Sequence, residues 1–278
     1  MRLAELCQRM KGESMRYYVV ADVHGYHDIM IDALAENGYF KDKEPHKLII
    51  CGDLFDRGAQ TLKMQEFVAD LIDKDEVILI RGNHEDLMLD LLEHLQEYLY
   101  APGSIECTHH HQNGTFKTAL TLSRMNRHDL DCYPQRFVNT VRNSLYIKKI
   151  IPAMVDYFET DNYVFVHGWI PCHQTVYRSG EYTYTPLSTD WRCADEKQWE
   201  RARWYNGMAS WKCGVTEPSG KTVVCGHYRT SWGHSWLHNE GTDLGVNDIL
   251  TPFCDKGIIA LDACTKRSLS VNCIVIED

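Results

Sequence analysis

Five short apolar runs of this 278-residue sequence each end in a polar loop that contains aspartate, asparagine or histidine. The runs are residues 17–21, 48–51, 77–80, 164–166 and 222–225, and the loops contribute Asp22, His24, Asp53, Asn83, His167 and His227. Carboxylate oxygen and imidazole nitrogen together suit first-row transition metals, whereas an all-oxygen set would suit Mg²⁺ or Ca²⁺. Six ligands are enough for two ions when water or substrate completes the coordination. The pattern therefore predicts two divalent transition-metal ions, with manganese favoured and iron or zinc as alternatives.

Each of these motifs also has a simpler interpretation. An Asp-x-His after a strand is ordinarily a turn with a capping carboxylate, and an Asn-His at a helix start is ordinarily an N-cap. Five motifs that each end an apolar run favour a metal site over five unrelated caps. Within that site, Asp53 can bridge two ions because it has two carboxylate oxygens.

The apolar runs alternate with stretches of helical periodicity. Helices are expected at residues 28–37, 61–73 and 85–98, between and after the first three strands. This alternation favours an α/β fold with a largely parallel sheet, in which ligands lie at the carboxyl ends of the strands. Residues 257–262 and 270–276 return to strand-like alternation, and we expect them to complete a second sheet.

The chain is expected to form one large domain over residues 1–278, because the polar loops are spread from residue 22 to residue 227. Residues 1–14 look like a helical lead-in. Two segments depart from the alternation and are interpreted as insertions. Residues 101–150 should be helical and contain several histidines and basic residues, whereas residues 170–220 are rich in tryptophan and tyrosine.

The charge and cysteine content exclude several classes of protein. A formal charge of -10 argues against electrostatic binding to a nucleic acid polymer or an anionic membrane. No run of about 18 apolar residues occurs, and the first residues contain no apolar core of signal-peptide length. The 11 cysteines include no CxxC pair, so reduced thiols are expected. We therefore expect a soluble, cytoplasmic protein that binds neither nucleic acid polymers nor membranes.

The polar loops also contain motifs in a specific order. They read Asp-x-His-Gly, Gly-Asp-x-x-Asp-Arg-Gly, Gly-Asn-His-Glu, His-Gly and Gly-His. This set resembles the phosphoprotein phosphatase branch of the calcineurin-like metallophosphoesterases, in its bacterial or phage type. The likeness is close over residues 17–90, with later anchors at His167 and His227; Ala21 stands where the family usually has glycine. It implies a two-sheet sandwich flanked by helices, in the layer order αββα.

The resemblance also implies roles for the ligand residues. One metal would be held by Asp22, His24 and Asp53, and the second by Asp53, Asn83, His167 and His227. Two ions about 3.5 to 4 Å apart can clamp a phosphoryl group and lower the pKa of a bridging water, so that hydroxide attacks phosphorus directly.

Three neighbouring residues are expected to complete the catalytic machinery. His84 lies beside Asn83 and is the candidate general acid for the leaving group, and Asp56 would orient its ring. Arg57 offers a planar fork for two phosphate oxygens, although a surface salt bridge is the simpler alternative.

The family usually adds a second phosphate-binding arginine between His167 and the final Gly-His. The candidates here are Arg192, Arg201 and Arg203. We favour Arg203, because an aromatic neighbour could fix the plane of its guanidinium.

These features predict a metal-dependent phosphatase for phosphate monoesters. A phosphoserine or phosphothreonine protein is the expected substrate, or a small phosphate ester. The alternative is a symmetrical diadenosine tetraphosphatase or another nucleotide phosphohydrolase, since the basic and aromatic residues of 101–150 suit a nucleotide. A non-enzymatic scaffold with this fold would be expected to have lost His84 or a metal ligand, and all are present.

Two further groups of residues have competing interpretations. Residues 109–111 are three consecutive histidines, and we interpret them as a solvated loop because adjacent histidines cannot all face one ion in regular structure. The tryptophans of residues 170–220 either line a substrate mouth or form the small core of that segment.

Overall fold

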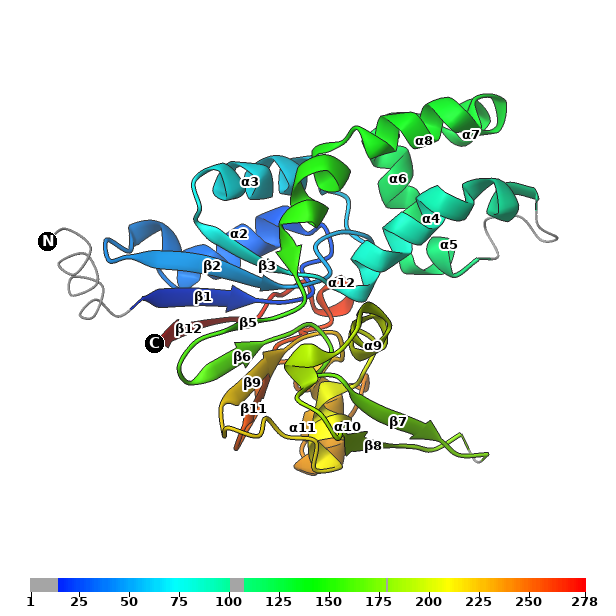
Figure 1. Cartoon of the computed structure of the whole chain (residues 1–278). Coiled ribbons are helices and arrows are strands. Elements are labelled where there is room, and N and C mark those ends of the chain that lie inside the picture. Colours follow the sequence, from blue (N-terminus) through cyan, green and yellow to red (C-terminus); the bar gives the residue numbers. More distant parts are fainter. Residues whose placement is uncertain (1–14, 101–107, 179) are drawn as a thin grey trace, which may run out of the picture.

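The computed structural model describes residues 15–100, 108–178 and 180–278, so the helical lead-in expected before them lies outside the described residues. Two five-stranded sheets pack face to face, and helices cover the outer face of each (Figure 1). The expected α/β sandwich of two sheets between helical layers is confirmed.

The first sheet has the strand order β12-β1-β2-β3-β4. Its parallel strands are β1 (Arg16–Val20), β2 (His46–Cys51), β3 (Val77–Ile80) and β4 (Met154–Val155), and the antiparallel edge strand is β12 (Cys273–Glu277). The second sheet has the order β10-β11-β9-β6-β5. Its members are β10 (Phe253–Asp255), β11 (Ile258–Ala260), β9 (Thr222–Cys225), β6 (Tyr163–Phe165) and β5 (Phe158–Glu159).

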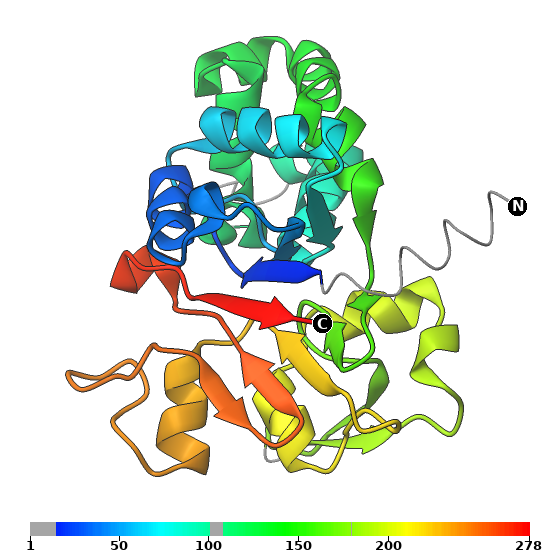
Figure 2. The same cartoon turned by 90° about the vertical axis from the view of Figure 1, so that its left-hand side faces the viewer.

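The last strand differs from the expectation. We expected residues 270–276 to complete the second sheet, whereas β12 pairs with β1 in the first sheet (Figure 2). Its alternation places Ile276 in the core between the two sheets. The alternation predicts which side chains of the strand are buried, but it does not predict which of the two sheets the strand joins.

Successive side chains of a strand point to opposite faces of the sheet, and this alternation divides the core into layers. In β2, Leu48 and Ile50 face the helices, whereas Ile49 and Cys51 face the second sheet. In β9, Val223 faces outward and Val224 packs into the central layer. Strands with both faces buried read as continuous apolar runs, which explains the runs found in the sequence.

Helices on the first sheet are α2 (His27–Glu36), η1 (Tyr39–Lys41), α3 (Thr61–Asp73) and α4 (Asn83–Tyr100). The segment after α4 forms α5 (His109–Asn113), α6 (Thr115–Ser123), α7 (Arg127–Cys132) and α8 (Pro134–Arg142), here called the helical cap. The turns η3 (Tyr146–Ile150) and η4 (Ile151–Ala153) lead back to β4.

The second sheet is covered by elements of the later sequence. They are the hairpin β7 (Cys172–Val176) and β8 (Tyr182–Pro186), then η5 (Trp191–Cys193), α9 (Glu196–Ala202), α10 (Gly207–Lys212) and α11 (Thr230–Leu237). The short helix α12 (Thr265–Ser268) lies between β11 and β12.

Within the described ranges, all nine cysteines are free, as expected. No described helix is both long and apolar enough to cross a membrane.

Candidate metal centre

The six predicted ligands converge at the carboxyl ends of the parallel strands. Their positions follow β1 for Asp22 and His24, β2 for Asp53, β3 for Asn83, β6 for His167 and β9 for His227. The first five are at most 2% exposed, so the groups are shielded from water. Parallel strands bring these loops to one edge of each sheet, and the packing of the two sheets brings both edges together.

The contacts of His167 provide a test of whether this site suits a cation. Its Nδ1 lies 2.8 Å from the carbonyl oxygen of Cys51, and its Nε2 lies 2.9 Å from Oδ1 of Asn83 and 3.3 Å from Oδ1 of Asp53. Burial lowers the pKa of His167, so the ring is neutral and carries one N–H. One ring nitrogen must therefore present a lone pair to an oxygen acceptor. A metal ion between Nε2 and these oxygens would remove that conflict.

His227 and His24 complete the two sides of the site. Nδ1 of His227 lies 2.9 Å from the same Asn83 oxygen. Nδ1 of His24 lies 2.9 Å from the carbonyl oxygen of Phe55, which leaves Nε2 facing Oδ2 of Asp53 at 3.7 Å. A backbone or carboxylate partner on the second ring nitrogen is typical of histidines that bind metals.

Asp53 is shared by two groups of residues with ligand-type atoms. One group contains Asp53, His167 and His227, and the other contains Asp53, His24 and His84, with all atoms of a group within 4.8 Å of one another. Burial alone would raise the pKa of Asp53, but the four surrounding imidazoles lower it below its ordinary value. Its carboxylate is therefore charged and can serve both groups.

The loops around the site have an unusual backbone. Among the described non-glycine residues, twelve have positive φ, and six of them belong to this site: Asp22, His24, Asp53, Asp56, Arg57 and His227, with φ between 45° and 72°. A left-handed conformation costs an L-residue roughly 1–2 kcal/mol. Such strain is typical of functional sites, where surrounding contacts impose it.

Glu85 supplies some of those contacts. Its buried carboxylate accepts N–H bonds from Gly82 at 2.8 Å and from Asp53 and Leu54 at 3.1 Å each. Burial and the charge of Asp53 raise the pKa of Glu85 to about 7. A Cβ atom at position 82 would collide with the Asp53 carboxylate and backbone, so only glycine fits. Glu85 thus fixes the loop that carries Asp53.

His84 and Asp56 form the expected pair. Nδ1 of His84 lies 2.7 Å from Oδ2 of Asp56, and the same oxygen accepts a 2.6 Å hydrogen bond from the hydroxyl of Thr115. Burial lowers the pKa of His84, but the charges of Asp53 and Asp56 outweigh it and raise the pKa above the ordinary value. His84 therefore keeps its proton to a higher pH than an ordinary histidine. Thr115, from the helical cap, had no signal in the sequence.

Arg57 lies beside both rings rather than in a surface salt bridge. Its Nη1 is 2.6 Å from Nε2 of His24, and its Nη2 is 3.2 Å from Nε2 of His84. Gly114, at the start of α6, packs directly on the Arg57 backbone. The guanidinium thus faces the point where the ligand groups meet.

Asp262 is a site residue that the sequence reading missed. It is 7% exposed, and burial raises its pKa to about 6. Burial, followed by the charges of Asp262 and Asp53, also raises the pKa of Asp22. The signal was present, since Asp262 follows β11 as the predicted ligands follow their strands.

Arg203, the arginine expected to bind phosphate, lies among carboxylates. Its guanidinium is 2% exposed and donates to Asp86 at 2.8 Å, Asp156 at 2.5 Å and Glu196 at 3.3 Å. These carboxylates neutralise the charge, so Arg203 joins α4 to the second helical layer as a structural ion pair. Arg192 is likewise paired, with Glu159 at 2.8 Å.

Two other expectations are resolved by the packing. The histidine run forms the start of α5 rather than a loop: His109 and His111 are exposed, but His110 is fully buried, and its Nε2 lies 2.8 Å from Asp90 of α4. Trp191 and Trp199 belong to the core of the second layer. Trp204, in contrast, is 49% exposed, and its ring centroid lies 5.8 Å from that of His227. The aromatic segment therefore provides both a core and a wall of the site.

Comparisons with known proteins give partial matches to two curated phosphohydrolases. A Bis(5'-nucleosyl)-tetraphosphatase PrpE [asymmetrical] of Bacillus velezensis is 37% identical over 76 residues, which cover 25% of this chain and 30% of that protein. A Bis(5'-nucleosyl)-tetraphosphatase, symmetrical, of Buchnera aphidicola is 32% identical over 102 residues, which cover 33% of this chain and 35% of that protein. The alignments thus span about a third of these curated relatives.

A solved structure of a point mutant of a cold-active protein tyrosine phosphatase covers 96% of this chain and 76% of its own, with a TM-score of 0.50 and 18% identity. At that identity the likeness concerns the fold alone. The model of the calcineurin-like phosphoesterase family matches residues 15–242, which is most of the chain. The protein therefore belongs to the calcineurin-like phosphoesterase family.

Proposed function

We propose that this protein is a metal-dependent phosphohydrolase that cleaves dinucleoside polyphosphates. The proposal rests chiefly on one observation, a basic and partly apolar pocket that opens directly beside Arg57. Two groups of curated relatives, named as symmetrical and asymmetrical bis(5'-nucleosyl)-tetraphosphatases, support the same substrate class.

The ligand geometry suits two ions that share Asp53. We assign Asp22, His24 and Asp53 to one ion, and Asp53, Asn83, His167 and His227 to the other. Two divalent ions, when bound, would supply the positive charge that polarises a phosphoryl group and the acidity that activates water. Three imidazoles in the set favour Mn²⁺, Fe or Zn²⁺ over Ca²⁺ or Mg²⁺.

The remaining polar residues have roles that follow from their contacts. Arg57 aims its guanidinium fork at the centre, where it can hold two phosphoryl oxygens. His84 keeps its proton through the bond to Asp56 and can deliver it from Nε2 to the departing oxygen. Thr115 holds Asp56 in the position that this transfer needs.

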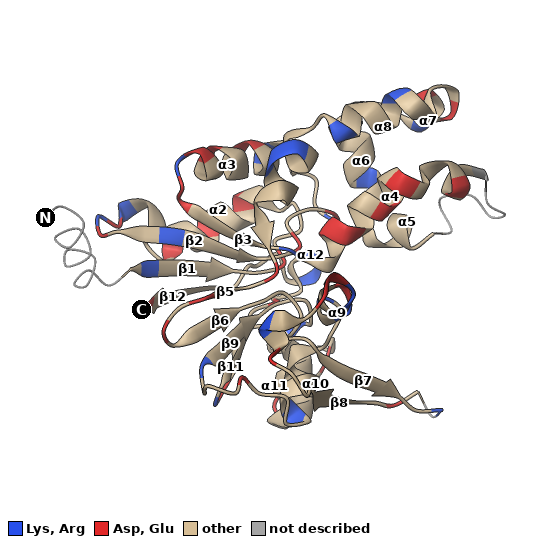
Figure 3. Cartoon of the chain, viewed as in Figure 1, with Lys and Arg blue, Asp and Glu red and all other residues tan. Residues whose placement is uncertain are grey.

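The substrate pocket has a volume of about 500 Å³ and lies between the helical cap and α12. Arg57, Lys117 and Lys266 give it positive charge, and Phe116 and Leu120 give it apolar surface. Arg127 also lines it and is paired with Asp131 at 2.9 Å. Among the described residues that line it, none is an aspartate or a glutamate. Figure 3 shows basic segments in α6 and near α12, on the side of the molecule where the loops of the first sheet end. Phosphates next to Arg57 and a base against Leu120 would use both kinds of surface.

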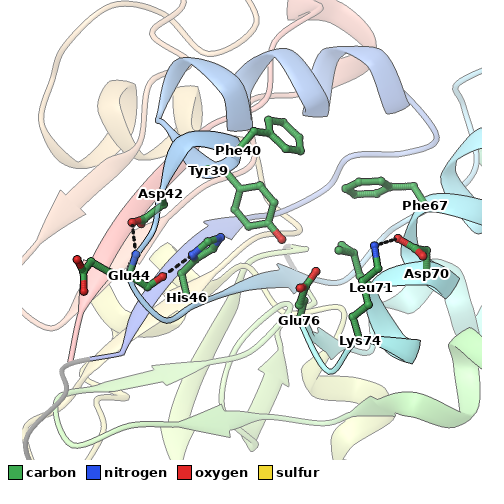
Figure 4. A pocket seen from close by; sticks show the side chains of 10 residues that line it. All are labelled: Tyr39, Phe40, Asp42, Glu44, His46, Phe67, Asp70, Leu71, Lys74 and Glu76. Carbon is green, nitrogen blue, oxygen red and sulfur yellow. Dashed lines mark hydrogen bonds and ion pairs between the residues drawn. The ribbon is translucent and has the colours of Figure 1, made fainter.

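A second pocket, of about 450 Å³, has a mainly acidic lining instead (Figure 4). It is lined by Asp42, Glu44, Asp70 and Glu76, with aromatic rings of η1 and α3 around it. His46 and Glu76 place it at the amino ends of β2 and β3, opposite the metal centre. Four carboxylates would repel a polyphosphate, so this pocket does not compete for the substrate.

Phosphoserine or phosphothreonine protein hydrolysis is the second candidate, and the His84–Asp56 pair favours it. A serine alkoxide is a poor leaving group that needs a proton, whereas a nucleotide phosphate departs readily without one. The pair thus supports a monoesterase activity, while the basic pocket supports the polyphosphate substrate.

Substrate competition in one assay would separate the two candidates. Protein loaded with Mn²⁺ should hydrolyse diadenosine tetraphosphate with a kcat/KM at least tenfold above that for a phosphoserine peptide. Chromatography of the products would distinguish symmetrical cleavage to ADP from asymmetrical cleavage to ATP and AMP. A higher kcat/KM for the phosphopeptide would overturn the proposal.

A pocket variant provides the matched control. Lys117→Ala should raise KM for diadenosine tetraphosphate roughly 10- to 150-fold, since a hydrogen bond to a charged group contributes about 1.5–3 kcal/mol. Its kcat/KM for p-nitrophenyl phosphate should not change, because this small ester does not fill the pocket. Lys43→Ala removes the same charge from an exposed position at the opposite edge of the sheet and should affect neither substrate.

A further inference from the structure

A separate group of ligand-type side chains lies at the carboxyl end of α11. His234 belongs to this helix, His238 ends it, and Glu240 follows two residues later. One ring nitrogen or carboxylate oxygen from each side chain lies within 4.8 Å of those of the other two. The proposed phosphohydrolase reaction uses none of these residues.

The helix and its neighbouring strand position the two rings. Because His234 and His238 are four residues apart, both project from one side of α11. Phe253 of β10 packs against them, with ring centroids 5.6 Å from His234 and 4.6 Å from His238. The imidazoles are therefore held in place before any ligand arrives.

His234 has a buried nitrogen without a partner. Its Nε2 lies 3.2 Å from the carbonyl oxygen of Thr251 and donates its proton there. In a neutral ring, Nδ1 then presents a lone pair. The side chain is 10% exposed, and Nδ1 is buried without a hydrogen-bond partner among the described residues. A buried acceptor in this state is destabilising, and a cation would satisfy it.

The other two residues have the geometry of co-ligands. Nε2 of His238 lies 3.2 Å from Oδ2 of Asp255, which leaves Nδ1 to bind an ion in the carboxylate–histidine–metal arrangement. Oε2 of Glu240 lies 3.8 Å from Nδ1 of His234, too far for a hydrogen bond. Two ligands of one tetrahedral Zn²⁺ lie about 3.3–3.6 Å apart, given metal–ligand distances of about 2.0–2.2 Å.

We propose that His234, His238 and Glu240 bind one divalent transition-metal ion, best fitted by Zn²⁺, in a site separate from the dinuclear centre. The carboxylate of Glu240 is 60% exposed, so water can complete the coordination. The ion joins the end of α11 to the loop that follows it. That loop also carries Asp243, which forms a two-pronged ion pair with Arg229, two residues after His227. The bound ion thus stabilises the segment that carries a ligand of the dinuclear centre.

Counting zinc in a ligand variant tests this site. The full chain is stripped with a chelator, reloaded with Zn²⁺ alone, passed through gel filtration and measured by elemental analysis. His238→Gln should bind one ion fewer than the wild type. The readout is the difference between the zinc counts of the two proteins, because the dinuclear residues are identical in both. If the dinuclear assignment failed, both totals would fall and the difference of one would remain.

Three further variants keep the test decisive. Glu240→Gln changes an exposed side chain that the fold does not need, and it should weaken zinc binding even if His238→Gln fails to fold. Asp255→Asn should weaken binding about 10- to 100-fold by releasing the His238 ring. His173→Gln removes an exposed histidine of β7 and should leave the zinc count unchanged. Equal zinc content in the wild type, His238→Gln and Glu240→Gln, or an equal loss in His173→Gln, would overturn the proposal.

Discussion

Replacing Asp56 by asparagine removes the charge that orients His84 while keeping the shape of the side chain. Asp56 accepts bonds of 2.7 Å from His84 and 2.6 Å from Thr115 and is 1% exposed. A hydrogen bond to a charged group contributes about 1.5–3 kcal/mol and a neutral one about 0.5–1.5 kcal/mol. The difference of about 1–2 kcal/mol predicts a roughly 5- to 30-fold fall in kcat for a phosphate ester with a poor leaving group.

The pH dependence of kcat provides a second test of the Asp56 variant, with a predicted direction of change. His84 must carry a proton to act as an acid, so its contribution is present below its pKa and is lost as pH rises through it. The charges of Asp53 and Asp56 hold that pKa up against the lowering effect of burial. Asp56→Asn therefore moves the alkaline limb of the kcat profile to lower pH. The profile is measured with phenyl phosphate, and p-nitrophenyl phosphate serves as the ester that needs no proton.

Metal content separates Asp56 from the ligand three residues before it. Asp53→Asn should lose bound metal as well as rate, whereas Asp56→Asn should retain the metal in elemental analysis. Equal metal loss in the two variants would show that Asp56 is a ligand. An unchanged kcat and an unmoved alkaline limb in Asp56→Asn would refute its role in orienting His84.

Three other outcomes are expected. His84→Asn should lower the rate for a phosphoserine ester by about 10² to 10⁴, but the rate for p-nitrophenyl phosphate clearly less, and the metal content should not change. Equal losses of rate for the two esters would rule out His84 as the general acid. Chelation should abolish activity and Mn²⁺ should restore it better than Ca²⁺, which prefers oxygen ligands; full activity in a verified metal-free sample would contradict the dinuclear site. The hydrogen bond from Arg192, opposed by burial and aided by Lys221, lowers the pKa of Glu159 from 4.5 to about 2. The wild type should therefore have a higher Tm than Glu159→Gln above pH 4.5, with the difference vanishing as pH falls to about 2; a pH-independent difference would refute this.

The position of the site could be predicted because it depends on local rules. A strand has a period of two, so Asp22 and His24 point the same way, and parallel strands end at one edge. Both rules can be applied to residues close together in the chain. In the structure Asn83 follows β3, and His84 contacts Asp56 of the loop after β2.

The contacts that the sequence did not indicate involve partners distant in the chain. Arg203, which is expected to bind phosphate, pairs with Asp86 from 117 positions away, and no local pattern indicated that pair. His110 is buried because Asp90 of another helix meets it there. Thr115 reaches Asp56 across 59 positions. A tertiary contact with a carboxylate decides each case, and local sequence patterns do not indicate such contacts.

The centre combines backbone strain with buried charge, and one arrangement explains both. Left-handed loops at Asp22 and Asp53 turn carboxylates inward, where burial and the neighbouring Asp262 raise the pKa of Asp22. Backbone N–H bonds to Glu85 hold the Asp53 loop, and the N–H of His227 donates to Asp22 at 2.8 Å. The bond from His227 to Asp22 joins loops of the two sheets. The sandwich therefore holds ligand oxygens and nitrogens at short range through its own hydrogen bonds, and metal binding requires the release of protons rather than a rearrangement of the fold.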